Sequence, residues 1–403
     1  MSKLRVDSWK GIANYMQRGV RTVQRWHLDH GLPVYRVGGN KGSVYAFADE
    51  LDRWLAGGAA GEGKRDPPDA VVEEQKRRSA EAERLASELW EVRSEENFQA
   101  MLELYRSAID QYPDNVAGIA GLANSLIFGG LIESLDLCLA YPSIKAAVNK
   151  ALEKDPRHLK VQSAVAWANL LYEREWKQAD QRFTEILRVN PAFGPALFGK
   201  ALLNLACEDP VEATRFARAC WSAEPMGACQ GGLAAICMVY AGDMDGAAIM
   251  AKQVELTGAN CGILGVAQAM VSIHTMHPDE ALMMVQSLTE RHTRSNVLRG
   301  LLGYTFASAG HTERAEKVLE SLYTTGYSPG SWYAKALVMS RLGRIREAVD
   351  TLKQRSSVLS LWRFGHRTDR LLAPLHDNAE FHEILAICFP NNRYDSGRNG
   401  CAA

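Results

Sequence analysis

The chain has 403 residues, of which 47% are hydrophobic and 23% charged, and its formal net charge is −1. This composition excludes a largely disordered chain, and the length exceeds what one ordinary hydrophobic core encloses. No apolar run is long enough to span a membrane, and Asp7 interrupts a start that lacks a signal-peptide core. We therefore expect a cytoplasmic protein of more than one domain without membrane contact.

The charge of the chain is unevenly distributed along the sequence. Residues 1–45 hold eight Lys or Arg residues against two acidic ones, a net charge of +6, so the other 358 residues carry −7. A basic segment on an acidic body suggests that this segment meets a polyanion.

The eight cysteines are scattered without a CxxC pair, and we expect them to be reduced.

The first 55 residues predict two short helices separated by a tight turn. Ser8 is the expected N-cap of the first helix, Gly19 interrupts the pattern, and Gly31 ends the second helix. The residues expected to be buried are Ile12, Ala13 and Met16 in the first helix and Val20, Val23 and Trp26 in the second.

A hairpin and a third helix are expected next. Residues 34–37 and 43–47 have the pattern of two strands joined by a glycine-rich loop at 38–42. Residues 49–55 form the expected closing helix, with Leu51 and Trp54 facing inward.

This order of elements is that of a winged helix-turn-helix, and the sequence resembles the bacterial excisionase/MerR-type DNA-binding domain. The resemblance depends on RTVQRW at 21–26, GLP at 31–33, RVGG at 36–39 and LDRWL at 51–55. The wing departs from the family, because NKG follows the glycines where an aromatic residue or an arginine is frequent. The resemblance implies double-stranded DNA as the partner of this domain.

The second helix carries side chains suited to DNA. The candidates for base contacts are Arg21, Thr22, Gln24 and Arg25, because arginine suits guanine and glutamine suits adenine in the major groove. The candidates for phosphate contacts are Arg18, Arg36 and Lys41. One such small module buries only about 600–1,000 Å² on DNA, so we expect two copies, in a homodimer formed through the rest of the chain or through a shared partner.

Residues 56–75 are rich in glycine, proline and charge and predict a flexible linker. Beyond it, small residues recur with a period of 34, or 33 at the last step. The first series is Ala179, Ala213, Ala247, Ala281, Ala315 and Ala348, and the second is Trp167, Ala201, Ala235, Ala269, Gly303 and Ala336. A fixed period of this length is typical of stacked helical hairpins, and the small residues let paired helices approach closely.

The period resembles the tetratricopeptide repeat, which also places a proline near its end. Its matches are Pro113, Pro156, Pro191 and Pro225. We expect about eight hairpins, beginning near residues 82, 120, 160, 194, 228, 262, 296 and 329, with a lengthened helix or an insertion around 129–141. The array is expected to cover 76–368, and a capping helix and tail 369–403, as in many bacterial arrays. The predicted fold is mainly α, a winged helix-turn-helix head followed by this α-solenoid.

The resemblance implies that the first helix of each repeat lines a concave groove for a protein or peptide. The candidates for this face are Asn169, Lys200, Asn204 and Ser272.

Other motifs have structural interpretations. The loop at 38–43 lacks the spacing of a phosphate loop, and His274 with His277 has metal-like spacing without further ligands nearby. His376, Asp377 and His382 are interpreted as part of the cap. We expect no catalytic residue, metal or cofactor.

The main hypothesis is a DNA-binding transcriptional regulator whose repeats bind a protein or peptide or mediate assembly. The alternative is a tetratricopeptide scaffold or adaptor that does not bind DNA. An excisionase-type recombination accessory factor is a third hypothesis, against which the large array argues.

Overall fold

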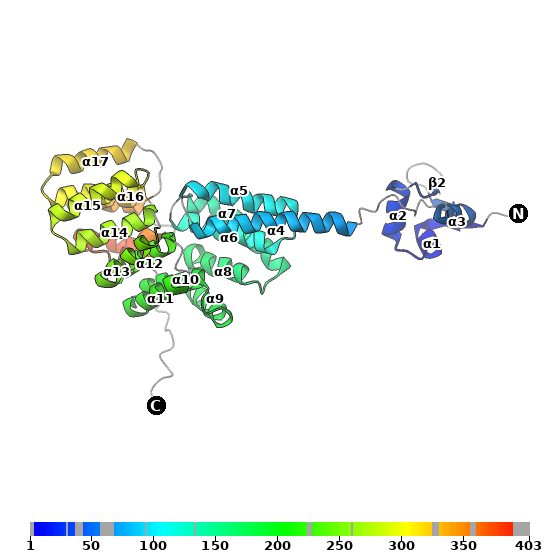
Figure 1. The fold of residues 1–403 in the computed structure, drawn as a ribbon, viewed down its shortest axis with the longest axis horizontal. Coiled ribbons are helices and arrows are strands. Elements are labelled where there is room, and N and C mark those ends of the chain that lie inside the picture. The colour runs from blue at the N-terminus through cyan, green and yellow to red at the C-terminus, as the bar shows by residue number, and fades with distance from the viewer. Residues whose placement is uncertain are drawn as a thin grey trace, which may run out of the picture. The chain divides into compact units, whose positions relative to one another are not determined.

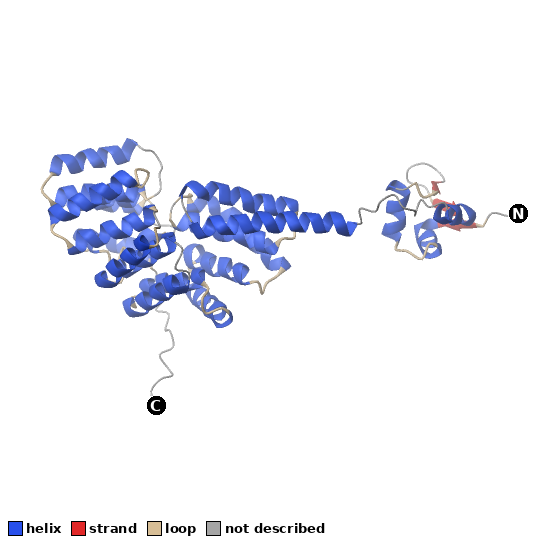
Figure 2. Cartoon of the chain, in the orientation of Figure 1, coloured by secondary structure: helices blue, strands red, loops and turns tan. Residues whose placement is uncertain are grey.

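The fold is that of a computed structural model. It describes residues 4–29, 31–36, 43–56, 68–92, 95–132, 134–223, 228–258, 261–324, 330–354 and 360–389, so the predicted loop at 38–42 lies outside the described residues. The described chain is mainly helical, and its strands lie near the N-terminus (Figure 2). It divides into two compact units, Met1–Glu74 and Gln75–Ala403, which we call the head and the repeat unit.

The head contains three helices and a three-stranded antiparallel sheet with strand order β1-β3-β2. The elements are β1 (Arg5–Asp7), α1 (Ser8–Tyr15), α2 (Val20–Asp29), β2 (Tyr35–Arg36), β3 (Val44–Phe47) and α3 (Ala48–Ala56). Val6 pairs with Ala46 and Tyr35 with Tyr45 across the sheet. The predicted order of helices and hairpin is present, and strand β1 was not predicted.

Local signals in the head behave mostly as expected. The hydroxyl of Ser8 accepts a hydrogen bond from the amide of Gly11 at 3.1 Å, and Gly31 has a φ of 64°. The expected buried residues of α1 and Val23 of α2 form the core together with Leu51. Val20 was expected in that core and is 37% exposed, because the first turn of α2 extends beyond the packed surface.

Helix α4 (Pro68–Val92) crosses the boundary between the two units and begins inside the predicted linker. Proline is favoured in the first turn of a helix, and the residues that follow it are good helix formers, so the chain becomes helical earlier than expected. The hydroxyl of Ser79 donates to the carbonyl of Ala108 at 2.6 Å, which fixes α4 against the next helix.

Fifteen further helices continue the repeat unit to residue 353 within the described residues, and together with α4 they form eight helical pairs (Figure 1). They are α5 (Glu95–Gln111), α6 (Val116–Leu131), α7 (Leu137–Lys154), α8 (Leu159–Ala168), α9 (Trp176–Val189), α10 (Gly194–Ala206), α11 (Pro210–Ala223), α12 (Ala228–Tyr240), α13 (Met244–Leu256), α14 (Gly262–Thr275), α15 (Pro278–Arg291), α16 (Asn296–Ser308), α17 (Thr312–Thr324), α18 (Ser331–Arg341) and α19 (Ile345–Lys353). A π-helical turn, η1 (Asn169–Glu173), extends α8. The first pair begins at residue 68 rather than near 82.

The small residues of the 34-residue period lie between packed helices, as predicted. Ala201 and Ala213 are fully buried within one pair. A Cβ atom added to Gly303 would lie 2.6 Å from a methyl group of Val338 in the next repeat. The extra residues around 129–141 lengthen α6 to 16 and α7 to 18 residues, against 13 and 14 in α10 and α11.

The C-terminal segment, Leu361–Phe389, follows the last pair. It contains α20 (Leu361–Phe364), the 3-10 helix η2 (Arg370–Leu375) and α21 (Ala379–Cys388). Parts of it pack against α18 and α19, which is the expected position of a cap. Among the described helices, none has an apolar stretch long enough to cross a membrane.

Candidate interaction sites

Helix α2 of the head presents the predicted base-contacting residues to different degrees. Arg21 and Arg25 lie about one helical turn apart and are exposed, whereas Thr22 and Gln24 are half-buried. Within the described residues, neither of these arginines forms an ion pair. The arginines therefore offer two uncompensated guanidinium groups on one side of the helix.

The predicted phosphate contacts are only partly described. Arg18 and Arg36 are exposed, and a guanidinium nitrogen of Arg18 donates to the carbonyl of Gln17 at 3.1 Å. Lys41 lies outside the described residues. The described candidates for DNA contacts thus include four exposed arginines, which lie just before α2, within α2 and in the strand β2.

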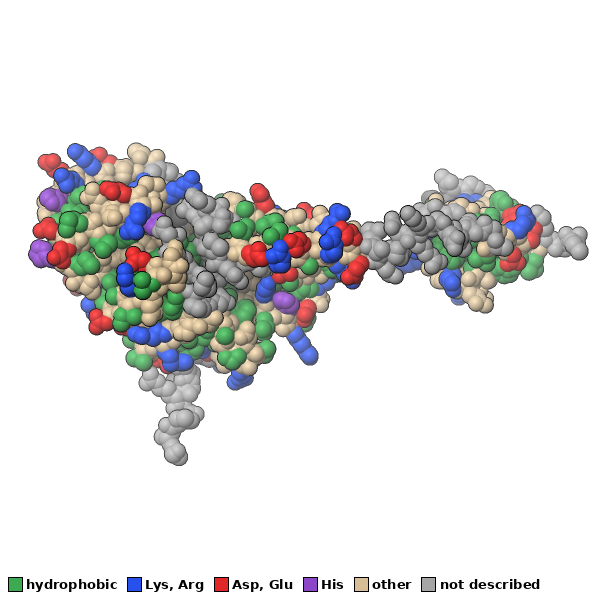
Figure 3. Space-filling model, viewed as in Figure 1, with side chains coloured by type: hydrophobic (Ala, Val, Ile, Leu, Met, Phe, Trp, Pro, Cys, Tyr) green, Lys and Arg blue, Asp and Glu red, His purple; other side chains and the backbone are tan. Residues whose placement is uncertain are grey.

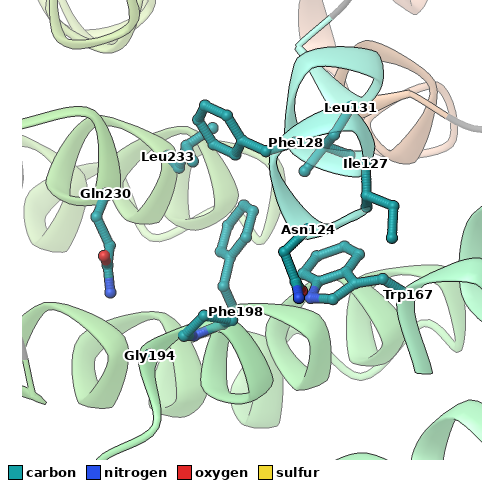
Figure 4. Close-up of a pocket in the computed structure, with 10 residues that line it drawn as sticks. Asn124, Ile127, Phe128, Leu131, Trp167, Gly194, Phe198, Gln230 and Leu233 are labelled. Carbon is teal, nitrogen blue, oxygen red and sulfur yellow. The ribbon is translucent and has the colours of Figure 1, made fainter. Parts of the chain in front are cut away.

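The first helices of four consecutive repeats line one pocket of the repeat unit. Figure 4 shows Phe128 of α6 and Phe198 of α10 projecting into the space between the helices, with Trp167 of α8 and Leu233 of α12 beside them. The pocket is a small hollow with a cavity volume of about 30 Å³, and it is open to solvent. Because α6 and α12 are three repeats apart, their meeting here means that the array curls and that this is its concave side.

Two polar side chains lie at the edge of this pocket. The amide of Asn124 is fully engaged, since its nitrogen donates to the carbonyls of Ala120 and Lys160 at 2.7 and 2.8 Å. The amide nitrogen of Gln230 donates to the carbonyl of Cys220 at 3.3 Å, but its buried oxygen has no partner among the described residues. A buried acceptor without a donor costs free energy, so a ligand with an N–H group would be favoured here.

Lys200 and Asn204, two predicted groove residues, are engaged within the array. The ammonium of Lys200 forms an ion pair with Asp180, and both side chains are about 15% exposed. The ammonium also lies 5.4 Å from the ring centroid of Phe216. The amide of Asn204 donates to the carbonyl of Lys200 at 2.7 Å.

Asn169 and Ser272, the other two predicted groove residues, are buried. The hydroxyl of Ser272 donates to the carbonyl of Gln268 at 2.8 Å, and the amide of Asn169 reaches Gln178 at 3.4 Å. Partner contacts by these residues remain predictions. The aromatic pocket itself was not predicted, although Trp167 stands in the period where the other repeats have alanine or glycine.

Four histidines were considered in the sequence as possible metal ligands or as part of the cap. His274 is half-buried, and burial lowers its pKa to about 4, whereas His277 is exposed. The ring nitrogens of His376 and His382 lie 3.2 and 2.7 Å from backbone carbonyls. Within the described residues no three His, Cys, Asp or Glu side chains gather as metal ligands.

The C-terminal segment also reaches distant repeats, which the sequence did not predict. The guanidinium of Arg367 donates to the carbonyl of Ala206 at 3.1 Å and pairs with Glu208 at 2.8 Å. Arg174 donates to the carbonyl of Ile387. Ala206 is the last residue of α10, Glu208 lies in the turn after α10, and Arg174 follows η1, so the segment contacts the C-terminal ends of two of the first helices.

A polar cluster is buried where the segment meets α12 and α18. The hydroxyl of Tyr333 donates to Asp369 at 2.5 Å, and the amide of Leu371 donates to the same carboxylate at 2.9 Å. Burial raises the pKa of Asp369 to about 6. Burial also lowers the pKa of His366 well below its ordinary value, and neither ring nitrogen of His366 has a partner among the described residues.

Charges of both signs alternate over the outer surface of the repeat helices on the face shown in Figure 3. The repeat unit contains exposed pairs of opposite charge such as Arg215–Glu212 and Lys252–Glu255. Such pairs contribute little to stability and create no field of one sign. On this face, therefore, charge does not select a partner.

Comparisons with known proteins concern the fold alone. No family model matches the sequence, and no curated protein is similar to it. The Cut9–Hcn1 hetero-tetramer of the APC/C contains a chain similar to this one at 15% identity and a TM-score of 0.49, over 84% of this chain and 59% of that one. Yeast Tom70 is similar at 14% identity and 0.39, over 73% and 59%.

A tetratricopeptide repeat protein from Parabacteroides merdae is similar at 12% identity and a TM-score of 0.31, over 77% of this chain and 99% of that one. The chain spans 59% of the length of the Cut9–Hcn1 chain and of Tom70. Its own 34-residue period and paired helices make the repeat unit a tetratricopeptide-like helical array.

Proposed function

We propose that the chain is an interaction scaffold whose repeat unit binds a segment of another protein at the concave pocket. The observation that carries this proposal is the aromatic pocket of Phe128, Trp167 and Phe198 with the unsatisfied acceptor of Gln230 at its edge. An apolar side chain of the partner packs on the aromatic rings at the mouth of the pocket, and an N–H group next to it donates to Gln230. The chain performs no catalytic step in this proposal.

The expected affinity is moderate. Burying one large apolar side chain contributes about 1.5–3 kcal/mol, and a hydrogen bond to the Gln230 oxygen adds about 1 kcal/mol. A binding segment therefore needs several further contacts along the first helices. This is the usual way in which repeat arrays use their extended surfaces.

Selection of peptides on the full-length chain tests this proposal. Peptides enriched on the wild type are expected to contain a large apolar residue, and Gln230→Leu should weaken their binding about tenfold, because it removes the acceptor at similar volume. Binding is measured by fluorescence anisotropy of the labelled peptide. Gln286→Leu, on α15, is the control and should leave the affinity unchanged.

Equal binding by Gln230→Leu and the wild type would argue against the pocket. Failure to enrich any apolar peptide would remove the support for the scaffold proposal.

We infer a second function for the head, binding of double-stranded DNA by α2 as in a winged helix-turn-helix. The specific support is Arg21 and Arg25, two exposed arginines that form no ion pair within the described residues, in a head that follows the helix, helix, hairpin, helix order. Arg18, Arg36 and Lys41 are the proposed phosphate contacts. With this head, the scaffold would be a transcriptional regulator, and a homodimer would supply the second copy that a small module needs.

Anisotropy of a labelled mixed-sequence duplex with the full-length chain tests the DNA proposal. About four phosphate contacts predict that log K falls with log salt with a slope near −4. Arg21→Ala/Arg25→Ala is expected to reduce affinity about tenfold and to make the slope shallower. Arg53→Ala, which removes an exposed arginine of α3, is the matched control.

No binding of the duplex at low salt would leave only the scaffold. The DNA proposal would also fail if Arg21→Ala/Arg25→Ala bound the duplex as tightly as Arg53→Ala.

A further inference from the structure

One position of the repeat is occupied by glycine in three repeats and by charged residues in two. It lies in the turn after the first helix and has a left-handed backbone. The glycines are Gly242, Gly310 and Gly343, with φ of 84°, 81° and 77°. The charged residues are Arg174 and Glu208, with φ of 57° and 61°. Glycine adopts this conformation without steric cost, whereas residues with a Cβ atom are strained in it.

Arg174 and Glu208 therefore cost conformational free energy that a glycine at the same position would not. They are spaced 34 residues apart, as are Glu208 and Gly242, so the position is the same in successive repeats. Strained backbone of this kind persists where surrounding contacts hold it. The strained residues thus point to contacts that offset the strain.

Those contacts are with the C-terminal segment. Arg174 donates to the carbonyl of Ile387, and Glu208 pairs with Arg367 at 2.8 Å. Beside them, the rings of Trp176 and Phe389 lie 6.3 Å apart. The repeats that keep glycine at this position lack a side chain that could make such contacts.

The interface between the segment and the array also leaves polar atoms unsatisfied. Among the described residues, the buried ring nitrogens of Trp176 and Trp362 and both ring nitrogens of His366 have no partner. A permanent core normally satisfies such groups, because each unmet one is costly. The interface is therefore less favourable than its apolar area suggests.

We propose that Arg174, Glu208 and Arg367 form a latch that holds α21 against the turns that follow α8 and α10, and that its release exposes the apolar surface beneath α21. The proposal goes beyond the scaffold function, because none of the described residues that line the concave pocket belongs to the C-terminal segment. The closed state is the one in the structure. The open state keeps the eight helical pairs and frees the end of the segment.

The variant Arg174→Gly/Glu208→Gly tests the latch in the full-length chain. It installs the residue that three other repeats carry, so it removes the latch contacts and relieves the backbone strain together. We expect amide hydrogen exchange in residues 379–389 to rise about tenfold, while the urea midpoint of the repeat unit stays unchanged. Arg367→Ala, which removes the partner of Glu208, should also raise amide hydrogen exchange in residues 379–389.

Opening is read with bis-ANS, a probe of accessible apolar surface. The double variant should increase bis-ANS fluorescence at least about twofold relative to the wild type. Glu212→Ala is the control, because it breaks the Glu212–Arg215 pair in α11 without touching the segment. It should change neither readout.

Unchanged exchange in 379–389 would overturn the latch. Faster exchange spread over 262–353 with a lower urea midpoint would also overturn it, since the contacts would then support the fold. Faster exchange without more bis-ANS fluorescence would overturn the exposure of the apolar surface beneath α21. Neither readout uses a peptide, so these failures are separate from failure of the peptide selection.

Discussion

Replacement of Gly300 by valine is expected to lower the free energy of unfolding of the repeat unit by about 3 kcal/mol. A Cβ atom at Gly300 in α16 would lie 2.5 Å from the Cα atom of Ala334 in α18. The obstacle is backbone, so no side-chain rotation relieves the clash and the two helices must move apart. Urea unfolding of the full-length chain, followed by helical circular dichroism, measures the loss.

Gly262→Ala is the matched control for this change. Gly262 begins α14 and has no atom within 4 Å of an added Cβ atom. Its replacement should leave the urea midpoint unchanged or raise it slightly, because alanine favours a helix. An unchanged midpoint for Gly300→Val would show that α16 and α18 are not in backbone contact.

Gly300 belongs to a part of the fold that the sequence predicts well. The period of small residues requires close helical pairs, and Ala201, Ala213 and Gly303 lie at the expected contacts. The turn at Gly31 and the lengthened α6 and α7 follow from signals of the same local kind. Local signals and a regular period determine these features because each depends on neighbours in sequence or in the next repeat.

Features that depend on distant segments were missed. The C-terminal segment reaches Arg174 and Ala206, which lie 213 and 161 residues before their partners Ile387 and Arg367, and no period relates such positions. One signal was nevertheless present, since charged residues replace a turn glycine in two repeats. The short strand β1 pairs with β3 across the head and likewise lacks a local pattern.

The candidate sites also combine features that the sequence predicts with features that it does not. The arginines of α2 are exposed as the helical pattern predicts, but Val20 is not buried as expected. The concave pocket depends on the curl of the array, which brings α6 to α12, and the sequence does not specify that curl. The predicted groove residue Lys200 pairs with Asp180 inside the array, and its contact with a partner remains a prediction.

Removal of the buried carboxylate by Asp369→Asn is expected to change stability in a pH-dependent way. Burial raises the folded-state pKa of Asp369 from 3.8 to about 6. The folded state therefore binds a proton more tightly than the unfolded state. The stability contributed by this proton is present below the ordinary pKa and is lost as pH rises through about 6.

From about pH 7.5 to about pH 4.5, the wild type should gain about 2 kcal/mol over Asp369→Asn, given a pKa of about 6 against 3.8. His366 has the opposite dependence, because its lowered pKa removes stability as pH falls below its ordinary value of 6.5. That contribution is present in both proteins and cancels in their difference. Urea unfolding of both proteins at the two pH values gives the result.

Asp350→Asn, which changes an exposed aspartate of α19, is the control for the substitution itself. A stability difference between Asp369→Asn and the wild type that stays constant with pH would mean that the Asp369 carboxylate is solvated when folded. In that case the segment would not be packed on Tyr333 as the 2.5 Å hydrogen bond indicates. A pH-dependent difference would instead confirm that the segment is closed over α12 and α18 around Asp369.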